Sequence, residues 1–320
     1  MRCRWVVVLV CSAACIGAGP TPAMSPSAAS PDVPRVTPSG FRLYDNDRIP
    51  DDIEVIKDVI YGQGGALPLR LNVVREKNQA GPPKPVIIYL PGGAFLTSDR
   101  NVATGRLAAL AQRGFVGVAV QYRTSSEGKF PAQIEDCKCA VRFLRAKAAD
   151  YHLDPNRIGV WGASAGGTLA ALLGTSEERA ELEGSGGWSG FSSRVQAVSA
   201  WYGGFDLRGA DIADPENPVF RWFGVNPHAV PERAQLASPL AQISPASAPF
   251  FAVVGDRDHP SVLKQSELMV AALKEAGVEA TLLVVPGYGH GFITATEAEQ
   301  MLAFFTRHLK SARAAPAAGK

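Results

Sequence analysis

The stretch Gly159–Gly174 reads GVWGASAGGTLAALLG and joins an apolar run to an alanine- and leucine-rich run through a single serine. The first part is predicted as a buried strand and the last part as a helix packed against the sheet. The spacing of Gly162, Ser164 and Gly166 is typical of a nucleophile elbow, in which the serine stands at the tip of a sharp strand-to-helix turn. Glycines at these places let the backbone turn and let the two elements approach closely. The alternative interpretation is a glycine-rich connection whose serine caps the helix.

The composition is that of a globular protein with one large α/β domain. Of the 320 residues, 46% are hydrophobic and 19% are charged, which excludes a disordered chain. The formal net charge is only +2, and no run of lysine and arginine forms a patch. Electrostatics therefore gives no reason to expect a nucleic-acid partner.

The two ends of the chain differ from its body. Residues 1–19 have a basic start, a short apolar stretch and then small residues, which predicts a signal peptide and an exported protein, secreted or periplasmic. The alternative is a lipoprotein anchored through Cys15, and apart from such a lipid anchor no membrane contact is expected. Residues 20–40 are rich in proline and serine and are predicted as a linker, and residues 313–320 as a disordered tail.

Two of the five cysteines, Cys137 and Cys139, fall in the folded part of the chain. Residues two apart in a helix point in different directions, so this pair is a poor disulfide and a poor metal site. Buried thiols are expected instead, and no metal or cofactor site is predicted.

Residues 41–312 are predicted as one α/β domain because apolar, β-branched runs alternate with helical patterns. The first two runs are close enough to form an antiparallel hairpin. The later alternation predicts a mainly parallel central sheet with helices on both faces. In such sheets the ligand site lies beyond the carboxyl ends of the strands, where Ser164 is expected. The expected strands are 53–61, 67–74, 85–91, 116–122, 157–162, 195–203, 250–256 and 280–287, and the expected helices are 102–113, 131–151, the stretch after Ser164, 261–277 and 296–309.

One long irregular stretch, residues 206–247, interrupts this alternation. It is rich in proline and contains Trp222 and Phe223. A loop of this length inside a compact domain is usually functional, so it is interpreted as a small cap insertion over the site. The alternative is a surface insertion with a small hydrophobic cluster of its own.

A serine hydroxyl becomes a nucleophile only when a base removes its proton. His290 is the preferred base, because PGYGHGF follows the last expected strand and surrounds the imidazole with glycines. Such a flexible loop at the carboxyl end of a strand can bring the ring over Ser164. The other four histidines are expected in solvated positions: His152, His228, His259 and His308.

The base needs an acid that holds its tautomer and stabilises the imidazolium. Asp258 is preferred, because it follows an expected strand and gives the chain order Ser, Asp, His of this architecture. Asp256 is closer to the strand end and is expected to shape the turn. Asp206 also follows a strand and remains a rival, although a role at the start of the cap is expected for it.

The negative oxygen of a tetrahedral intermediate needs backbone N–H donors. The sequence YLPGGAFLTSD follows the third expected strand and supplies a glycine-rich loop in the right place. Gly93, Ala94 and Ala165 are predicted as the oxyanion-hole donors. The alternative for this stretch alone is an ordinary turn.

Together these motifs resemble the α/β-hydrolase family, and within it exported carbohydrate esterases of the feruloyl and acetyl-xylan type and their general carboxylesterase relatives. The resemblance covers residues 53–309. It is carried by VIIYLPGGAF, KFPAQIEDCKCAVRFLRAKAADYHLDPNRIGVWGASAGG, GDRDHPSV and GYGHGF. It implies an α/β-hydrolase fold and ester hydrolysis through an acyl-enzyme, without a metal.

The oxyanion loop departs from the family pattern. These relatives usually have His-Gly-Gly-Gly, whereas this chain has Pro91, Gly92, Gly93 and Ala94. The missing histidine removes a hydrogen bond that supports the loop, and the alanine narrows the floor of the site. The departure puts the rate or the acyl preference in question, but not the reaction class.

The leading hypothesis is a serine ester hydrolase acting on short-acyl or feruloyl and acetyl esters of plant polysaccharide, or on smaller esters. An exported serine peptidase is the second enzyme class, although such relatives commonly carry an extra domain. A non-catalytic binding protein on a hydrolase fold is the third, although no member of the triad is missing. Four aromatic residues are candidate walls for a sugar or an aromatic acyl group: Trp188, Trp201, Tyr202 and Trp222.

Overall fold

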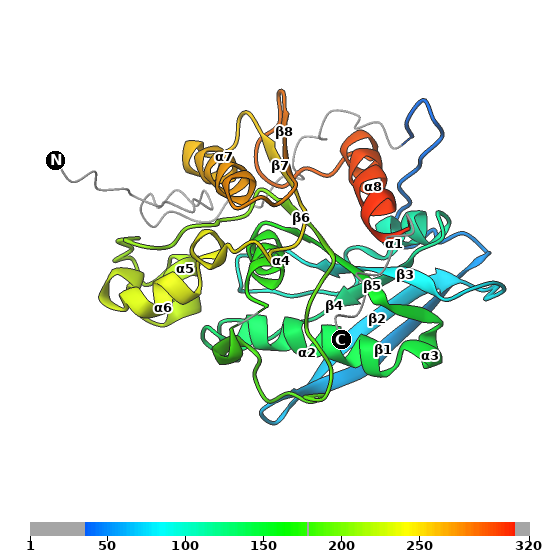
Figure 1. Cartoon of the computed structure of the whole chain (residues 1–320), viewed down its shortest axis with the longest axis horizontal. Coiled ribbons are helices and arrows are strands. Elements are labelled where there is room, and N and C mark those ends of the chain that lie inside the picture. Colours follow the sequence, from blue (N-terminus) through cyan, green and yellow to red (C-terminus); the bar gives the residue numbers. More distant parts are fainter. Residues whose placement is uncertain (1–35, 178, 311–320) are drawn as a thin grey trace, which may run out of the picture.

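The computed structural model describes residues 36–177 and 179–310, which form one eight-stranded sheet with helices around it (Figure 1). The strand order is β1-β2-β4-β3-β5-β6-β7-β8, and the pairs β1/β2 and β2/β4 are antiparallel. All other neighbours are parallel, which confirms the predicted hairpin and the mainly parallel sheet. The strands are β1 Ile53–Gly64, β2 Leu67–Glu76, β3 Lys84–Leu90, β4 Val116–Val120, β5 Leu153–Ala163, β6 Ala197–Trp201, β7 Phe250–Gly255 and β8 Ala280–Val285.

The inner strands are buried along nearly their whole length. Every residue of β4, β6 and β7 is buried, as is every residue of β3 after Lys84. Strands covered on both faces need apolar residues in succession, which explains why these stretches read as continuous hydrophobic runs. The edge strands β1 and β8 each have one free side and are more exposed.

Helices cover both faces of this sheet, as predicted (Figure 1). One face is covered by α1 (Thr104–Ala111) and α8 (Ala295–Leu309). The other face is covered by α2 (Ala132–Ala146), α4 (Ala165–Thr175) and most of the apolar face of α7 (Pro260–Glu275). The expected helix 131–151 divides, because its last residues form the separate short helix α3, Ala148–Tyr151.

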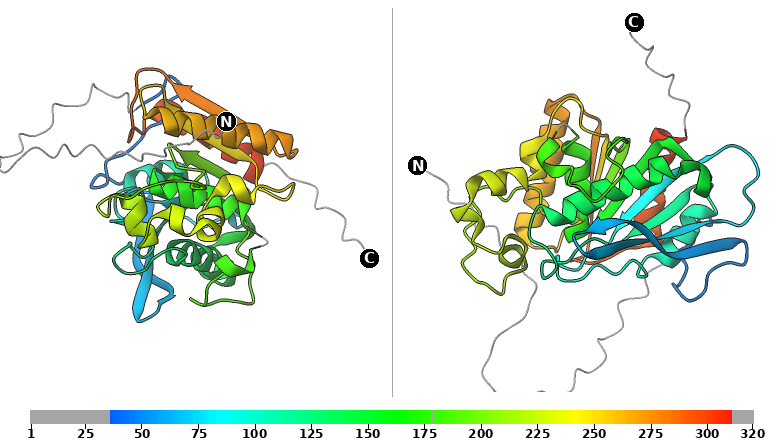
Figure 2. Two further views of the ribbon diagram at one scale, coloured as in Figure 1. Left: turned by 90° about the vertical axis from the view of Figure 1, so that its left-hand side faces the viewer. Right: turned by 90° about the horizontal axis from the view of Figure 1, so that it is seen from below.

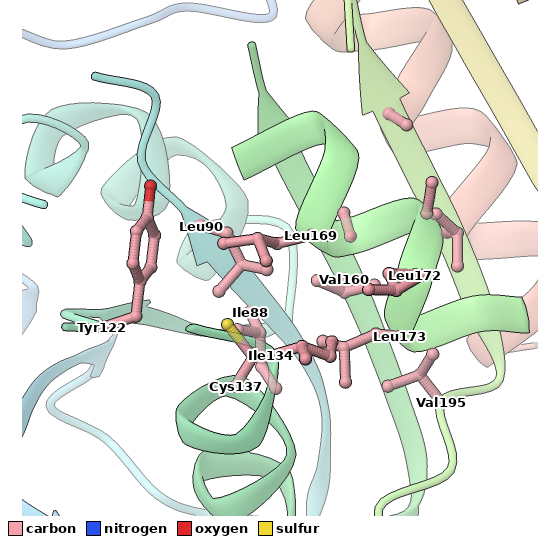
Figure 3. Close-up of a cluster of buried hydrophobic side chains, with 14 of the residues drawn as sticks. Ile88, Leu90, Tyr122, Ile134, Cys137, Val160, Leu169, Leu172, Leu173 and Val195 are labelled. Carbon is pink, nitrogen blue, oxygen red and sulfur yellow. The ribbon is translucent and has the colours of Figure 1, made fainter. Parts of the chain in front are cut away.

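Each face has its own hydrophobic cluster. Leu107 and Phe305 belong to the cluster under α1 and α8. Leu169 of α4 and Ile134 of α2 belong to the opposite cluster, together with Ile88 and Leu90 of β3 (Figure 3). Every residue of α4 is buried, so this helix needs small and apolar residues all round rather than along one stripe.

Residues 206–247 contain short helical turns within the irregular stretch that the sequence indicates. These are α5 (Pro218–Phe223), α6 (Pro231–Leu236) and the 3₁₀ turns Pro227–Ala229 and Pro239–Gln242. Each begins with a proline, whose fixed φ suits the first helical position. Figure 2 shows this region at the end of the molecule away from the β1/β2 hairpin.

The cap is joined to the main hydrophobic core and does not form a separate cluster. Trp222 and Phe223 both belong to the buried cluster of α2 and α4. The Trp222 ring stacks on Phe95, with the ring centroids 3.9 Å apart, and its Nε1–H donates to Gln133 Oε1. The cap therefore packs on the segment that follows the predicted oxyanion residues.

The described part of the predicted linker, residues 36–40, adjoins the first residue of the predicted domain, Phe41. These residues form a turn in which the amide N–H of Thr37 donates to Phe41 O. Phe41 itself is buried. The predicted signal peptide, the Cys15 anchor, the rest of the linker and the tail 313–320 lie outside the described residues.

Candidate active site

Ser164 is the single residue between β5 and α4, at the carboxyl edge of the sheet. Its φ is +55° and its ψ is −122°, a sparsely populated conformation that costs a non-glycine residue about 1 to 3 kcal/mol. The conformation is held by two backbone hydrogen bonds, from its amide N–H to Trp201 O and from Thr168 N–H to its own carbonyl oxygen. The Ser164 side chain makes no capping bond to α4, so the helix-cap interpretation is wrong.

The glycines of the elbow are required by close backbone contacts. A Cβ atom on Gly162 would lie 2.0 Å from Gly166 O, and one on Gly166 would lie 2.1 Å from Leu90 O. Both distances are far below any van der Waals contact. The turn therefore excludes side chains at these positions, as the spacing predicts.

The structure brings Ser164, His290 and Asp258 together. The His290 Nε2 atom lies 2.9 Å from Ser164 Oγ, and the Nδ1 atom lies 3.0 Å from Asp258 Oδ2 and 3.2 Å from Oδ1. The imidazole thus bridges a hydroxyl and a carboxylate, which come from the loops after β5 and β7, while its own loop follows β8. The Asp258 side chain is 2% exposed and that of His290 is 42% exposed. The base therefore faces solvent and its acid does not.

Two backbone hydrogen bonds fix Asp258. The backbone N–H of His259 donates to Asp258 Oδ1 at 2.6 Å, and the N–H of Asp258 donates to Gly255 O. Hydrogen bonds from a backbone amide stabilise a carboxylate in its ionised form. The carboxylate is thereby held in place to accept a hydrogen bond from Nδ1 of the imidazole.

The two rival acids have other partners. Asp256 Oδ1 accepts the N–H of Gly287 at 2.7 Å, which shapes the turn after β8. Asp206 pairs with Arg208 through two contacts of 2.8 and 2.9 Å at the start of the cap. These partners match the turn and cap roles that the sequence indicates for them.

The other four histidines lie in different surroundings. His152 Nε2 lies 3.1 Å from Gly81 O, and His259 caps α7, where its Nδ1 lies 2.8 Å from Ser261 Oγ. His228 is exposed in the cap, whereas His308 is mostly buried on α8 and faces Glu279 at 3.4 Å. The expectation of a solvated position is therefore wrong for His308.

The loop after β3 adjoins the nucleophile. A Cβ atom on Gly92 would lie 3.3 Å from Ser164 Cβ. Gly93, Ala94 and Phe95 all have positive φ, at +133°, +55° and +62°. This run of unusual dihedrals gives a backbone different from the ordinary turn that was the alternative interpretation.

The N–H groups predicted as oxyanion donors, those of Gly93, Ala94 and Ala165, are not engaged in backbone hydrogen bonds within the described residues. That of Ala165 is in the first turn of α4, where such groups have no intrahelical acceptor and the helix dipole favours negative charge.

Sequence reasoning missed the group that supports this loop. The hydroxyl of Tyr122 donates to Pro91 O at 2.6 Å, and Figure 3 shows it pointing out of the hydrophobic cluster beside the loop. Burial raises the pKa of Tyr122 well above its ordinary value, so the phenol remains a donor. A second bond runs from Ser125 N–H to Phe95 O. These two bonds support a loop that lacks the family's histidine. The only sequence signal for this role is that Tyr122 and Ser125 follow β4, the neighbour of β3 in the sheet.

The predicted aromatic walls are mostly core residues. Trp201 and Trp222 are fully buried, so the prediction that they line a site is wrong for both. Trp188 packs edge-on against Phe143 of α2, and its Nε1–H donates to the Tyr61 carbonyl oxygen on β1. Trp201 meets the triad only through its carbonyl oxygen, which accepts the Ser164 N–H, whereas the Tyr202 side chain contacts the His290 ring at a centroid distance of 4.9 Å.

The described residues contain no group of three or more His, Cys, Asp or Glu side chains that could hold a metal ion. Cys137 and Cys139 are free, buried thiols, as predicted. Burial raises the pKa of both, that of Cys139 to about 11. In the described part of the chain, no helix has the length and apolar character needed to cross a membrane.

The sheet order and the site beyond its carboxyl ends define an α/β hydrolase, and comparison with known proteins agrees. The chain belongs to the BD-FAE family of α/β-hydrolase esterases, whose model matches residues 71–273. Esterase LipQ of Mycobacterium tuberculosis (strain ATCC 25618 / H37Rv) is 32% identical over 253 residues, covering 77% of this chain and 59% of its own length. The chain thus spans about three fifths of the length of the curated relatives that it matches.

Two solved structures are also similar to this chain. One is a truncated form of a carbohydrate esterase from gut microbiota, with 29% identity and a TM-score of 0.72, covering 82% of this chain and all of the other. The second is a bifunctional GH43-CE protein of Bacteroides eggerthii, with 31% identity and a TM-score of 0.72. The match covers 82% of this chain and 39% of that protein.

Proposed function

We propose that this protein is a serine carboxylic ester hydrolase that acts through an acyl-enzyme. The observation that carries the proposal is the chain of contacts from Ser164 Oγ through the His290 imidazole to the Asp258 carboxylate. Each contact is within hydrogen-bond reach, which is the geometric requirement for a base-activated nucleophile. The esterase names of the related proteins support the same reaction class.

In the proposed first half-reaction, Ser164 Oγ attacks the ester carbonyl carbon while His290 Nε2 takes the hydroxyl proton. The carbonyl electron pair moves to oxygen, where the N–H groups of Gly93, Ala94 and Ala165 receive the negative charge. Asp258 accepts a hydrogen bond from Nδ1–H of His290 and stabilises the imidazolium. Collapse of the intermediate expels the alcohol, which takes the proton from Nε2.

The second half-reaction repeats these roles with water in place of the hydroxyl. His290 Nε2 takes a proton from a water molecule that attacks the acyl carbon of the Ser164 ester. The same backbone donors stabilise the second oxyanion. The acid is released, and the proton returns from Nε2 to Ser164 Oγ.

We infer that the substrates are short-acyl or feruloyl and acetyl esters of plant polysaccharide, or smaller esters of the same kinds. The similarity to a carbohydrate esterase from gut microbiota supports a carbohydrate-linked ester. The Ala94 methyl group on the loop beside Ser164 supports short acyl groups. Export of the chain, or anchoring through Cys15, suits an external polymer and follows from the pattern of residues 1–19.

A panel of p-nitrophenyl esters of rising chain length, tested beside acetylated xylan and methyl ferulate, examines this proposal. We expect kcat/KM to be greatest for acetyl to butyryl esters and acid to be released from at least one of the two plant substrates. A maximum at eight carbons or more would contradict the short-acyl part. Hydrolysis of none of the esters would favour a binding protein on a hydrolase fold, and cleavage of peptides alone would favour a peptidase.

A further inference from the structure

Tyr202 has an unusual backbone conformation at the carboxyl end of β6. Its φ is +39°, in a region that bulky residues rarely adopt and that costs about 1 to 3 kcal/mol. The surrounding structure holds it there through a bond of 2.7 Å from its N–H to Val253 O. Its side chain is almost fully buried. A strained residue at the edge of a catalytic site calls for an explanation in the site itself.

The side chain of Tyr202 reaches the His290 loop in two places. Its ring meets the His290 ring at a centroid distance of 4.9 Å and an interplanar angle of 61°, a T-shaped contact. Its hydroxyl donates to Phe292 O at 2.9 Å, two residues beyond the histidine. One rigid side chain therefore holds both the imidazole and the backbone that carries it.

The His290 loop needs such support because its own sequence gives it little. Gly289 and Gly291 flank the histidine, and Gly291 has a φ of +91°. Glycines lose more conformational freedom on ordering than other residues, so a loop of this composition is flexible unless contacts with the rest of the protein fix it. The Asp256 carboxylate tethers the loop before the histidine, and the Tyr202 hydroxyl tethers it after the histidine.

We propose that Tyr202 is a positioning residue for His290, which orients the imidazole so that Nε2 faces Ser164 while Nδ1 faces Asp258. This inference rests on the proposed ester hydrolase function. Burial raises the pKa of Tyr202 far above its ordinary value, which keeps the phenol protonated and able to donate. Tyr202 acts through the imidazole and not on the substrate, so its loss should lower kcat and leave KM nearly unchanged.

The test compares Tyr202→Phe with Tyr61→Phe. Tyr61 is a matched control, because it is fully buried on β1 and its hydroxyl donates to Gln121 O at 2.7 Å. Both variants keep the ring and lose one bond from a buried phenol to a carbonyl, so both should fold with similar losses of stability. Circular dichroism and thermal unfolding check this expectation.

The expected kinetic result is specific to one variant. Displacing a catalytic group by up to about 1 Å lowers kcat by about 10- to 100-fold. We therefore expect the kcat of Tyr202→Phe to be about 10- to 100-fold below that of the wild type, with KM within about twofold of the wild-type value. Tyr61→Phe should keep wild-type kcat. Tyr202→Leu, which also removes the ring contact with His290, should have a lower kcat than Tyr202→Phe. Equal kcat for both phenylalanine variants would overturn the proposal.

A second measurement is independent of hydrolysis and separates a failure of this proposal from a failure of the proposed function. The Nδ1 proton between His290 and Asp258 should give a strongly deshielded proton NMR resonance, which is assigned by its loss in His290→Asn. We expect Tyr202→Phe to broaden this resonance through faster exchange with water and Tyr61→Phe to preserve it. A resonance unchanged in Tyr202→Phe would overturn the positioning role, whether or not any ester is hydrolysed.

Discussion

Asp258→Asn isolates the role of the acid in the triad. Asp258 Oδ2 lies 3.0 Å from His290 Nδ1, and its side chain is only 2% exposed. Asparagine keeps the shape of the carboxylate but removes its charge and can turn a donor toward Nδ1, which favours the wrong tautomer of the imidazole. Such a substitution in a triad of this kind lowers kcat about 10⁴-fold, or about 5 kcal/mol of transition-state stabilisation.

The assay is kcat on p-nitrophenyl acetate, with circular dichroism to show that each variant is folded. Asp256→Asn and Asp206→Asn are the controls, since Asp256 bonds Gly287 N–H and Asp206 pairs with Arg208 outside the triad. We expect both controls to stay within about threefold of wild type. An asparagine at position 256 keeps an amide oxygen that can accept the N–H of Gly287 and so preserves the tether of the His290 loop, and Asp206 lies outside the triad, where such changes alter free energies by about 0.5 kcal/mol. A collapse only in Asp206→Asn, or only in Asp256→Asn, would refute the assignment of the acid.

Four further predictions concern the oxyanion loop, the fold, the thiols and the metal dependence. Tyr122→Phe removes the bond to Pro91 O and should lower kcat about tenfold or more at similar KM, measured with the same ester, since a displaced oxyanion donor loses most of its value. The Asp136 carboxylate is only 2% exposed and accepts N–H groups of Arg123. Asp136→Ala removes this acceptor and leaves the Arg123 guanidinium without its buried partner, so urea titration should show that the free energy of unfolding falls by about 3 kcal/mol or more. Burial raises the pKa of Cys139 to about 11, so only about one thiol in ten thousand is ionised at pH 7, and peptide mapping after brief iodoacetamide treatment should find it unmodified unless the chain is first unfolded. Hydrolysis should survive treatment with chelators, because the proposed triad and backbone donors need no metal; recovery by a divalent ion after loss to a chelator would contradict the mechanism.

The motifs predict the site because its chemistry depends on local geometry. Ser164 requires a turn that only the flanking glycines allow, and His290 and Asp258 each follow an apolar run that could be recognised as a strand. Once the sheet is parallel, the carboxyl ends of these strands meet at one edge, so residues distant in the sequence are predicted to be neighbours.

The supporting residues could not be predicted in the same way. Tyr122 and Tyr202 act through single hydrogen bonds to carbonyl oxygens 31 and 90 positions away, and no periodicity or spacing encodes such contacts. Trp201 and Trp222 show the opposite error. An aromatic residue near a strand end or in a cap suggests a substrate wall, but the side of the backbone on which it lies decides whether it is buried.

Covalent labelling of Ser164 tests the central claim most directly. The protein is treated with a phenylphosphonyl or sulfonyl fluoride, and the adduct is located by peptide mass spectrometry while residual hydrolysis is measured. The account predicts one adduct per chain on Ser164, hydrolysis lost in proportion to labelling, and a folded but inactive and unlabelled Ser164→Ala variant. Labelling at another residue, together with hydrolysis that survives in Ser164→Ala, would contradict it.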